Sequence, residues 1–221
     1  MMDYKRILLF AGHYGSGKTN IAVNVAMHLQ RERGNVTIAD LDIVNPYFRT
    51  KDSQKELERA GIRLICSEYA GTNLDAPALP PEMYAITDDR SHTAIMDIGG
   101  DDRGALALGR YAPAILEEGN YDMFLVINSY RPLTRDVAST LEIIREIETA
   151  GGIPFTAIVN NSNLGEETDA ETVLSSLGYA REISEATGLP IKMTSVREEL
   201  YEELKNSIPN LFPLTLQYKI K

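Results

Sequence analysis

The sequence predicts an α/β fold: a three-layer α/β/α sandwich around a mostly parallel sheet, built as one domain over residues 1–221. Short apolar runs alternate with longer helical patterns along almost the whole chain, which is typical of strand–helix–strand units. Most of these runs are continuously apolar, as expected for strands that a parallel sheet buries on both faces. A length of 221 residues suits one sizeable domain and is short for two.

Seven segments are predicted to be strands, because each is short, apolar and rich in β-branched residues. In chain order they are Arg6–Ala11, Val36–Asp40, Ile62–Cys66, Thr93–Ile98, Met123–Asn128, Phe155–Asn160 and Ile191–Ser195. Three segments have the periodicity or the end signals of long helices. They are Lys18–Arg33, which stops before Gly34, Thr134–Gly152, with Thr134 as its cap, and Asp169–Gly188. Residues 206–221 contain two prolines and predict an extended ending.

The composition disfavours several classes of partner. The chain has 22 basic and 32 acidic side chains and a net charge of −10, which works against binding to nucleic acid or to anionic membranes. The single cysteine, Cys66, excludes an intramolecular disulfide, and its apolar neighbours predict an inert core residue. No apolar run approaches the roughly 18 residues of a membrane span, and no signal peptide is recognisable, so we expect a cytoplasmic protein.

The stretch "GHYGSGKT", residues 12–19, matches the phosphate-binding motif G-x-x-x-x-G-K-[ST]. It stands between a predicted strand and a predicted helix, where its glycines let the backbone wrap a phosphate with the N–H groups turned inward. Lys18 is expected to reach the terminal phosphates, and the Thr19 hydroxyl is expected to bind Mg²⁺. The expected nucleotide-binding residues of this loop are Gly12, His13, Tyr14, Gly15, Ser16, Gly17, Lys18 and Thr19.

A further strand ends in "DIGG", which reads as a metal-binding aspartate followed by a switch. Asp97 would bind Mg²⁺ through water, and the N–H of Gly100 would sense the γ-phosphate. The alternative is an aspartate that only caps the turn after the strand.

The second strand ends in "ADLDIVNPYFR" and provides two more carboxylates. Asp40 and Asp42 leave the sheet together, and Asp42 is the better placed to orient the attacking water and to approach the metal. The alternative is a pair of solvated turn residues. The loop Asn45–Arg49, with two adjacent aromatics and an arginine, is a candidate contact for a partner or substrate.

These features together resemble the MinD/ParA group of P-loop ATPases, the deviant Walker A or SIMIBI class that includes the CobQ/CobB nucleotide-binding domains. The resemblance rests on the early P-loop, on "DLD" after the second strand and on "DIGG" after the later one. It implies that Asn160, with Asn161 close behind, binds adenine at the end of a strand. The guanine-reading motif [N/T]-K-x-D is missing, which favours ATP over GTP.

The P-loop departs from this family at its second and third positions. The family's K-G-G-x-G-K-[ST] places a lysine where this chain has His13 and a glycine where it has Tyr14. In the family that lysine reaches the partner's nucleotide in a nucleotide-dependent homodimer, and a neutral imidazole cannot supply a permanent positive charge. The trans-acting lysine mechanism is therefore not transferred. Arg49, Arg103 and Arg131 are the candidates to replace its charge.

The predicted function is a slow ATPase that acts as a nucleotide-dependent switch on an unknown protein partner. Its moving parts would be the Asp42–Arg49 loop and the Gly99–Arg110 loop, which contains the charged stretch from Asp101 to Arg110. The alternative for this stretch is a solvated cluster of charges that pair with each other. The alternative is an ATP-dependent ligase or kinase, similar to dethiobiotin and cobyrinate amide synthetases, in which the same loops contact a small substrate. A metalloenzyme chaperone is a third reading, which the lone cysteine disfavours.

Overall fold

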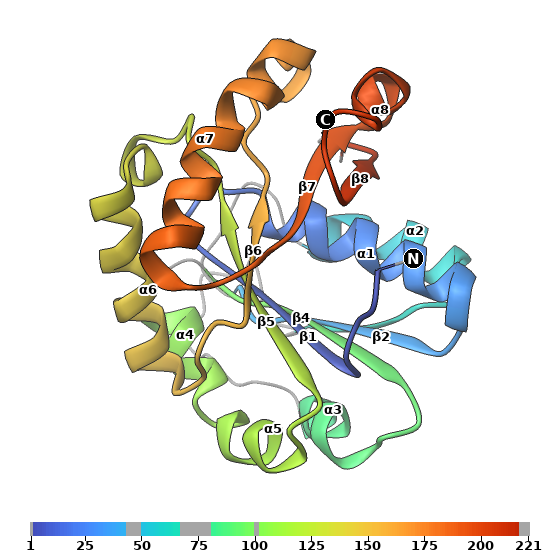
Figure 1. Ribbon diagram of the computed structural model, residues 1–221. Coiled ribbons are helices and arrows are strands. Elements are labelled where there is room, and N and C mark those ends of the chain that lie inside the picture. The colour runs from blue at the N-terminus through green and yellow to red at the C-terminus, as the bar shows by residue number, and fades with distance from the viewer. Residues whose placement is uncertain (1, 43–49, 67–80, 100–101, 217–221) are drawn as a thin grey trace.

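The computed structural model describes residues 2–42, 50–66, 81–99 and 102–216, apart from the side chains of residues 51, 52, 102 and 103. Within these ranges, eight strands form one sheet in the order β3-β2-β4-β1-β5-β6-β7-β8, and every neighbouring pair is parallel (Figure 1). The strands are β1 (Ile7–Ala11), β2 (Val36–Asp40), β3 (Arg63–Ile65), β4 (Thr93–Asp97), β5 (Tyr121–Ile127), β6 (Ala157–Asn160), β7 (Ile191–Arg197) and β8 (Leu211–Leu214). The predicted α/β class with a mostly parallel sheet is confirmed.

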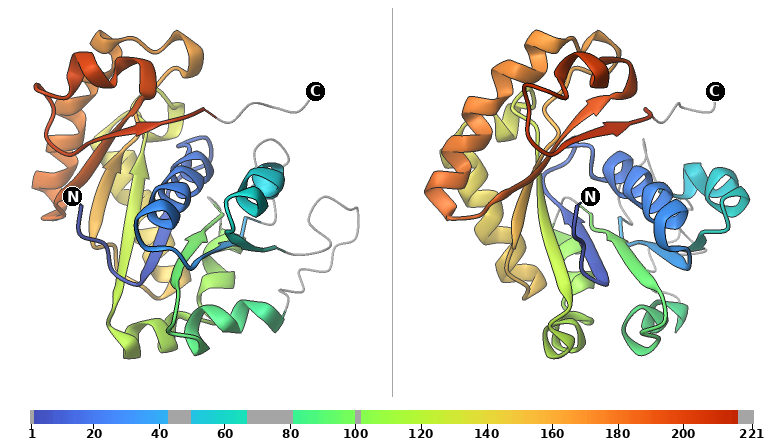
Figure 2. Two further views of the ribbon diagram at one scale, coloured as in Figure 1. Left: turned by 90° about the vertical axis from the view of Figure 1, so that its right-hand side faces the viewer. Right: turned by 45° about the vertical axis from the view of Figure 1, so that its right-hand side comes forward.

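Helices cover both faces of the sheet, with α1 and α2 on one side and α6 and α7 on the other (Figures 1 and 2). The helices are α1 (Lys18–Arg33), α2 (Gln54–Arg59), α3 (Ala85–Asp88), α4 (Asp102–Leu108), α5 (Ala112–Glu118), α6 (Val137–Gly151), α7 (Ala170–Thr187) and α8 (Glu198–Leu204). Short 3-10 turns span Thr50–Ser53, Pro81–Tyr84, Pro132–Thr134 and Gly165–Glu167. Along β1, Leu8 and Phe10 pack with the α1 side, whereas Ile7 and Leu9 pack with the α6 side. None of the described helices is long and apolar enough to cross a membrane.

Two of the long helices have the predicted ends, and the third starts later than predicted. α7 begins after Asp169, whose Oδ1 accepts the N–H of Thr172 at 2.8 Å. The cap of α6 is Asp136, whose Oδ1 accepts the Ser139 N–H at 2.9 Å. The prediction that Thr134 caps this helix is wrong, because its hydroxyl donates to a loop carbonyl instead and the residue ends a 3-10 turn.

The two outer strands of the sheet, β8 and β3, differ from the sequence-based prediction. The segment predicted as an extended ending contains β8, which pairs with β7 after the α8 crossover. Pro213 has no N–H to donate, and β8 tolerates it because this strand lies at the edge of the sheet that the described residues form. At the other edge β3 covers only Arg63–Ile65, so Cys66 lies beyond its end and is partly buried rather than a core residue.

The strand order places the ends of three strands side by side. β4 lies between β1 and β2, so the chain leaving β1 at Ala11 enters the P-loop next to the end of β4. The register pairs Phe10 with Asp97, and Asp97 with Asp40. The carboxyl ends of parallel strands form the edge where ligands bind in open α/β sheets. The candidate phosphate-binding and metal-binding residues therefore meet at one edge.

Candidate functional site

The P-loop backbone adopts a conformation that three of its glycines make accessible. Gly12, Gly15 and Gly17 have φ angles of 150°, 78° and 89°, which side chains other than glycine rarely adopt. A Cβ on Gly12 would lie 2.4 Å from the carbonyl oxygen of Val126, and one on Gly17 would lie 2.2 Å from the Asn161 amide nitrogen. The loop thus passes too close to β5 and to the segment after β6 for any side chain at these positions.

The P-loop passes directly into the first turn of α1, where two side chains predicted to bind the nucleotide and the metal are buried. Lys18 and Thr19 are 4% and 6% exposed. The Lys18 ammonium donates to the His13 carbonyl at 3.3 Å, and the same carbonyl accepts the Ser16 N–H at 3.1 Å. The Ser16 hydroxyl is buried and has no hydrogen-bond partner among the described residues. In contrast, Tyr14 is 48% exposed at the outside of the loop.

Asp97 and Asp40 point towards this first turn because of their place in the strands. Ile38 and Ile95 precede them by two residues and pack in the apolar cluster that contains α1. Side chains alternate along a strand, so Asp40 and Asp97 lie on the same face of the sheet as these isoleucines. Asp40 is 5% exposed, and Asp97 is fully buried.

The Asp97 carboxylate is only partly satisfied. Its Oδ2 accepts the Thr50 hydroxyl at 3.0 Å, while its Oδ1 has no hydrogen-bond partner within the described part of the chain. Burial raises the pKa of Asp97 to about 6, and the nearby Asp42 charge adds to this rise. The Lys18 charge and the hydroxyls of Thr19 and Thr50 act in the opposite direction but do not cancel it.

Asp40 and Asp42 form a tight turn at the end of β2. The Asp42 N–H donates to Asp40 Oδ1 at 2.9 Å, and both side chains are 5% exposed. Asp40 therefore holds the backbone that presents Asp42. Within the described ranges, no group of three or more His, Cys, Asp or Glu side chains is close enough to hold a metal ion by itself.

The two asparagines after β6 are bound into the protein. Asn161 donates to the Ser16 carbonyl at 2.6 Å and accepts the Ser195 hydroxyl at 2.5 Å, so it braces the P-loop against β7. Asn160 is fully buried, and its amide donates to the Ser176 hydroxyl at 2.9 Å. Adenine contact by either residue stays a prediction.

Of the three arginines that could replace the charge of the family's lysine, Arg131 is the one whose side chain the structure describes. It contacts the P-loop. It follows β5, and its Nε donates to the Gly15 carbonyl at 3.0 Å. Its side chain passes 3.6 Å from the position that a Cβ on Gly15 would occupy. The guanidinium therefore places a positive charge beside the phosphate-binding loop from within the same chain. Arg49 and the side chain of Arg103 lie outside the described residues.

The segment predicted to act as a switch is described only in part. Gly100, Asp101 and the Asn45–Arg49 loop lie outside the described residues. α4 follows directly, and its Gly104 packs on the backbone of Gly99: a Cβ at this position would lie 2.5 Å from the Gly99 Cα. The backbone after Asp97 is thus in direct contact with a helix on the surface of the protein.

Some contributors to the site have no signal in the sequence. Thr50 binds Asp97 from 47 positions away, and Ser195 binds Asn161 from the next strand. Both are common residue types outside any recognisable motif. The Asn128 side chain similarly joins two loops, accepting the N–H groups of Tyr130 and Asn163 at 3.0 and 3.3 Å. Only the three-dimensional arrangement identifies these supports.

No protein-family model and no curated protein matches the chain. Solved structures do: the 54 kDa protein of the signal recognition particle from Aeropyrum pernix K1 in complex with GDP has a TM-score of 0.52 and 16% identity, covering 87% of this chain and 41% of that one. Chloroplast FtsY from Physcomitrella patens has a TM-score of 0.56 and 16% identity, with 87% and 58% covered. FtsY from Thermotoga maritima has a TM-score of 0.57 and 17% identity, with 88% and 62% covered.

These similarities concern the fold. The chain spans less than two thirds of the length of each of these three structures, and the identities are low. None of the three is a MinD/ParA protein, so that closer resemblance stays a prediction. The parallel sheet and its flanking helices agree with these neighbours, and the chain has the P-loop NTPase fold.

Proposed function

We propose that the protein binds Mg·ATP between the P-loop and the end of β4, hydrolyses it slowly and acts as a nucleotide-dependent switch on a protein partner. The observation that carries this proposal is Oδ1 of the fully buried Asp97, next to the first turn of α1, which has no hydrogen-bond partner among the described residues. A buried carboxylate with one oxygen left without a hydrogen bond is costly, and a cation would stabilise it.

The residues present fit a magnesium ion that is completed by a nucleotide. Mg²⁺ in such sites is held by one or two carboxylates, by phosphate oxygens and by water, rather than by a cage of protein ligands alone. Thr19 would bind the ion through its hydroxyl and Asp97 through water, with Asp42 close to the same position. When bound, the ion would neutralise the charge that develops on the phosphate oxygens.

The protein's own groups would bind and orient the remaining parts of the substrate. The inward-facing N–H groups of the P-loop and the Lys18 ammonium would hold the phosphates. Asp40 is occupied with the backbone of Asp42, which makes it a positioning residue and leaves Asp42 as the group to orient the attacking water. Arg131 would add positive charge at the outer side of the loop.

ATP is preferred over GTP because the segment after β6 reads "NNSN" and lacks the carboxylate of the guanine-reading motif. The nearest following aspartate, Asp169, is occupied as the cap of α7. One structural neighbour was solved with GDP, so the choice of base is a direct comparison to make. Titration of the protein with ATP and with GTP, each with and without Mg²⁺, tests this part of the proposal.

The switch would act through the contact between Gly99 and α4. Gly104 leaves no space between the two backbones, so a nucleotide that moves the segment after Asp97 would displace α4 as well. A surface altered in this way suits a protein partner or a second copy of the chain. A nucleotide-dependent homodimer would make turnover depend on protein concentration.

The experiment is ATP turnover against protein concentration with Mg²⁺, using Lys18→Ala and Asp97→Asn as variants. We expect slow turnover by the native protein and none by either variant. A rate per protomer that rises with concentration would indicate the homodimer. Turnover that needs no Mg²⁺ or survives Lys18→Ala would contradict the proposal, and turnover only with a small metabolite would favour the ligase or kinase alternative.

A further inference from the structure

A polar cavity lies at the amino ends of the strands, on the opposite side of the sheet from the carboxyl ends where the P-loop lies. It has a volume of about 340 Å³ and is lined by residues just before β1, β2, β4 and β5. It is therefore at the amino ends of the strands, whereas the P-loop, Asp40 and Asp97 are at the carboxyl ends. Nothing in the proposed nucleotide chemistry uses this cavity, which we call the amino-edge pocket.

The amino-edge pocket is positively charged in an acidic protein. Among the described residues, Arg6, Arg33 and Arg90 line it and no aspartate or glutamate does, although the net charge of the chain is −10. Glu118 lies behind the lining: it contacts Arg6 at 2.5 Å and Arg90 at 3.7 Å. Asp89 is 3.5 Å from the ring of the lining residue His92. These carboxylates compensate part of the charge from outside the cavity.

Arg6 is a fixed part of the wall. Its guanidinium binds both oxygens of Glu118 and donates to the carbonyls of Ile86, Asp89 and His92. The hydrogen bond to Arg6 lowers the pKa of Glu118, which keeps the pair charged. Arg6 therefore orders the segment before β4 rather than offering free donors.

Arg33 differs, because within the described residues it pairs with no carboxylate. Its Nη1 donates to the Tyr4 carbonyl at 3.3 Å, and no other hydrogen bond of its guanidinium is present among those residues. Arg33 belongs to the last turn of α1, where the helix dipole favours positive charge. The dipole explains a basic residue in this turn, but it does not explain a guanidinium turned to the chain before β1.

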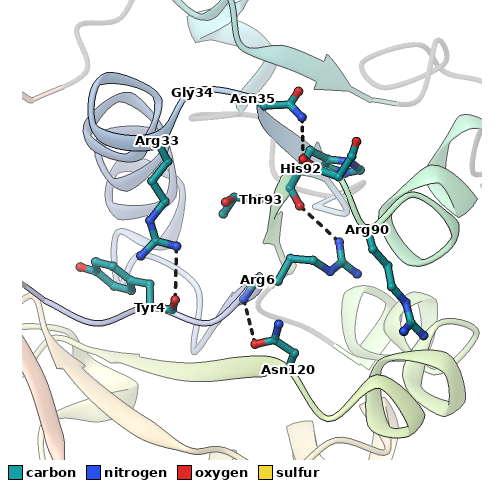
Figure 3. Close-up of a pocket in the computed structure, with 10 residues that line it drawn as sticks. Tyr4, Arg6, Arg33, Gly34, Asn35, Arg90, His92, Thr93 and Asn120 are labelled. Atoms are coloured by element: carbon teal, nitrogen blue, oxygen red, sulfur yellow. Dashed lines mark hydrogen bonds between the residues drawn. The ribbon is translucent and has the colours of Figure 1, made fainter.

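Two neutral donors share the cavity with Arg33. Figure 3 shows Thr93 between Asn35 and Asn120, with the Arg33 side chain reaching down from α1 beside them. Asn120 Oδ1 accepts the Arg6 N–H at 3.3 Å, which leaves its amide nitrogen for a ligand. The Thr93 hydroxyl has no hydrogen bond within the described part of the chain, and the residue is 9% exposed. Guanidinium, amide and hydroxyl donors together match an oxyanion.

We propose that the amino-edge pocket binds a small anionic metabolite through a phosphate or carboxylate group, with Arg33, Thr93 and Asn120 as the contacts. The volume suits a small ligand rather than a chain segment. This site is separate from the nucleotide site, so it stands even if the nucleotide proposal fails.

The test uses inorganic phosphate and citrate as probes, followed by the backbone amide signals of the protein in NMR spectra. The Lys18→Ala background removes phosphate binding at the P-loop. We expect saturable shifts at Thr93 and Asn120 with at least one probe. Phosphate alone would identify a phosphate ligand, and citrate alone a carboxylate ligand. Shifts with neither probe, or only at residues 12–19, would overturn the proposal.

A matched pair of variants separates the pocket from general electrostatics. Arg33→Gln and Arg31→Gln remove the same charge from the last turn of α1, but Arg31 does not line the cavity. We expect Arg33→Gln to lower the affinity for the probe by about tenfold and Arg31→Gln to lower it by less than about twofold. Equal effects would overturn the proposal. Thr93→Val removes one donor without changing charge, so it decides the outcome if Arg33→Gln does not fold.

Discussion

The burial of the Asp97 carboxylate predicts opposite effects of Asp97→Asn on stability. The variant should be more stable than the native protein in the absence of Mg·ATP and less stable than the native protein in its presence. Burial raises the pKa of Asp97 from its ordinary value of 3.8 to about 6. At about 1.4 kcal/mol per pKa unit, this rise corresponds to at most about 3 kcal/mol of lost stability when the carboxylate is ionised. Asp97→Asn removes the charge and keeps an acceptor for the Thr50 hydroxyl.

The sign of the pH dependence follows from the raised pKa. Below pH 3.8 the carboxyl is protonated in both the folded and the unfolded protein, so it contributes no difference. Between pH 3.8 and about 6 the unfolded chain ionises first, and the folded protein loses stability as the pH rises. Asp97→Asn should therefore raise the free energy of unfolding at pH 7.5 and have much less effect at pH 4.

The assay is urea unfolding of the native protein and of Asp97→Asn at both pH values, with and without Mg·ATP. Ligand at about 1,000 times its dissociation constant adds about 4.1 kcal/mol to a protein that binds it only when folded, which exceeds the advantage of the variant. We expect this gain for the native protein and little of it for the variant, so the order of stability reverses at pH 7.5. Destabilisation by Asp97→Asn at pH 7.5 without ligand would refute the reasoning, because it would make Asp97 a structural cap.

Three further substitutions test the supports of the site. Gly17→Ala should abolish ATP binding and destabilise the fold by about 1–3 kcal/mol, because the new Cβ would clash with the Asn161 amide and the Gly17 φ of 89° is strained for alanine. Calorimetry measures the loss of binding, and urea unfolding measures the loss of stability. Arg131→Gln should weaken ATP binding by about three- to tenfold in a calorimetric titration. Arg135→Gln, from the same loop, should stay within about twofold, and equal effects would show that only bulk charge matters. Gly104→Ala should destabilise the fold by about 1–3 kcal/mol in urea and alter turnover, and unchanged values would exclude the tight contact of α4 with Gly99.

The sequence predicted the main elements where a local pattern dictates them. α1 begins at the end of the glycine-rich loop and stops before Gly34, and β2 and α7 also lie where the sequence predicted them. β8 escaped prediction because a proline in "LFPL" argues against a strand unless the strand lies at an edge. Edge position depends on the order of all the other strands, which no short pattern carries.

The candidate site likewise contains residues that a local motif predicts and partners that no local pattern indicates. Gly12, Lys18, Thr19 and Asp97 follow from motifs at strand ends, and parallel pairing brings those ends together. The partners of these residues come from distant segments and have no motif, as Thr50 shows. The roles implied for Asn160 and Asn161 by family resemblance meet amides that are already bonded, which local sequence does not reveal.

The two ends of the strands differ in charge and in the helix ends beside them. Acidic side chains lie at the carboxyl ends, near helix N-termini, and basic side chains lie at the amino ends, near helix C-termini. Each helix that follows a parallel strand begins near the carboxyl edge and ends near the amino edge. At the carboxyl edge, Asp97 faces the start of α1 together with Lys18, and burial still leaves its pKa raised. At the amino edge, Arg33 ends α1 without a carboxylate partner among the described residues. On our proposals, a metal ion would stabilise the Asp97 carboxylate and an anion would stabilise the Arg33 guanidinium, so the two ends of the strands would take different classes of ligand.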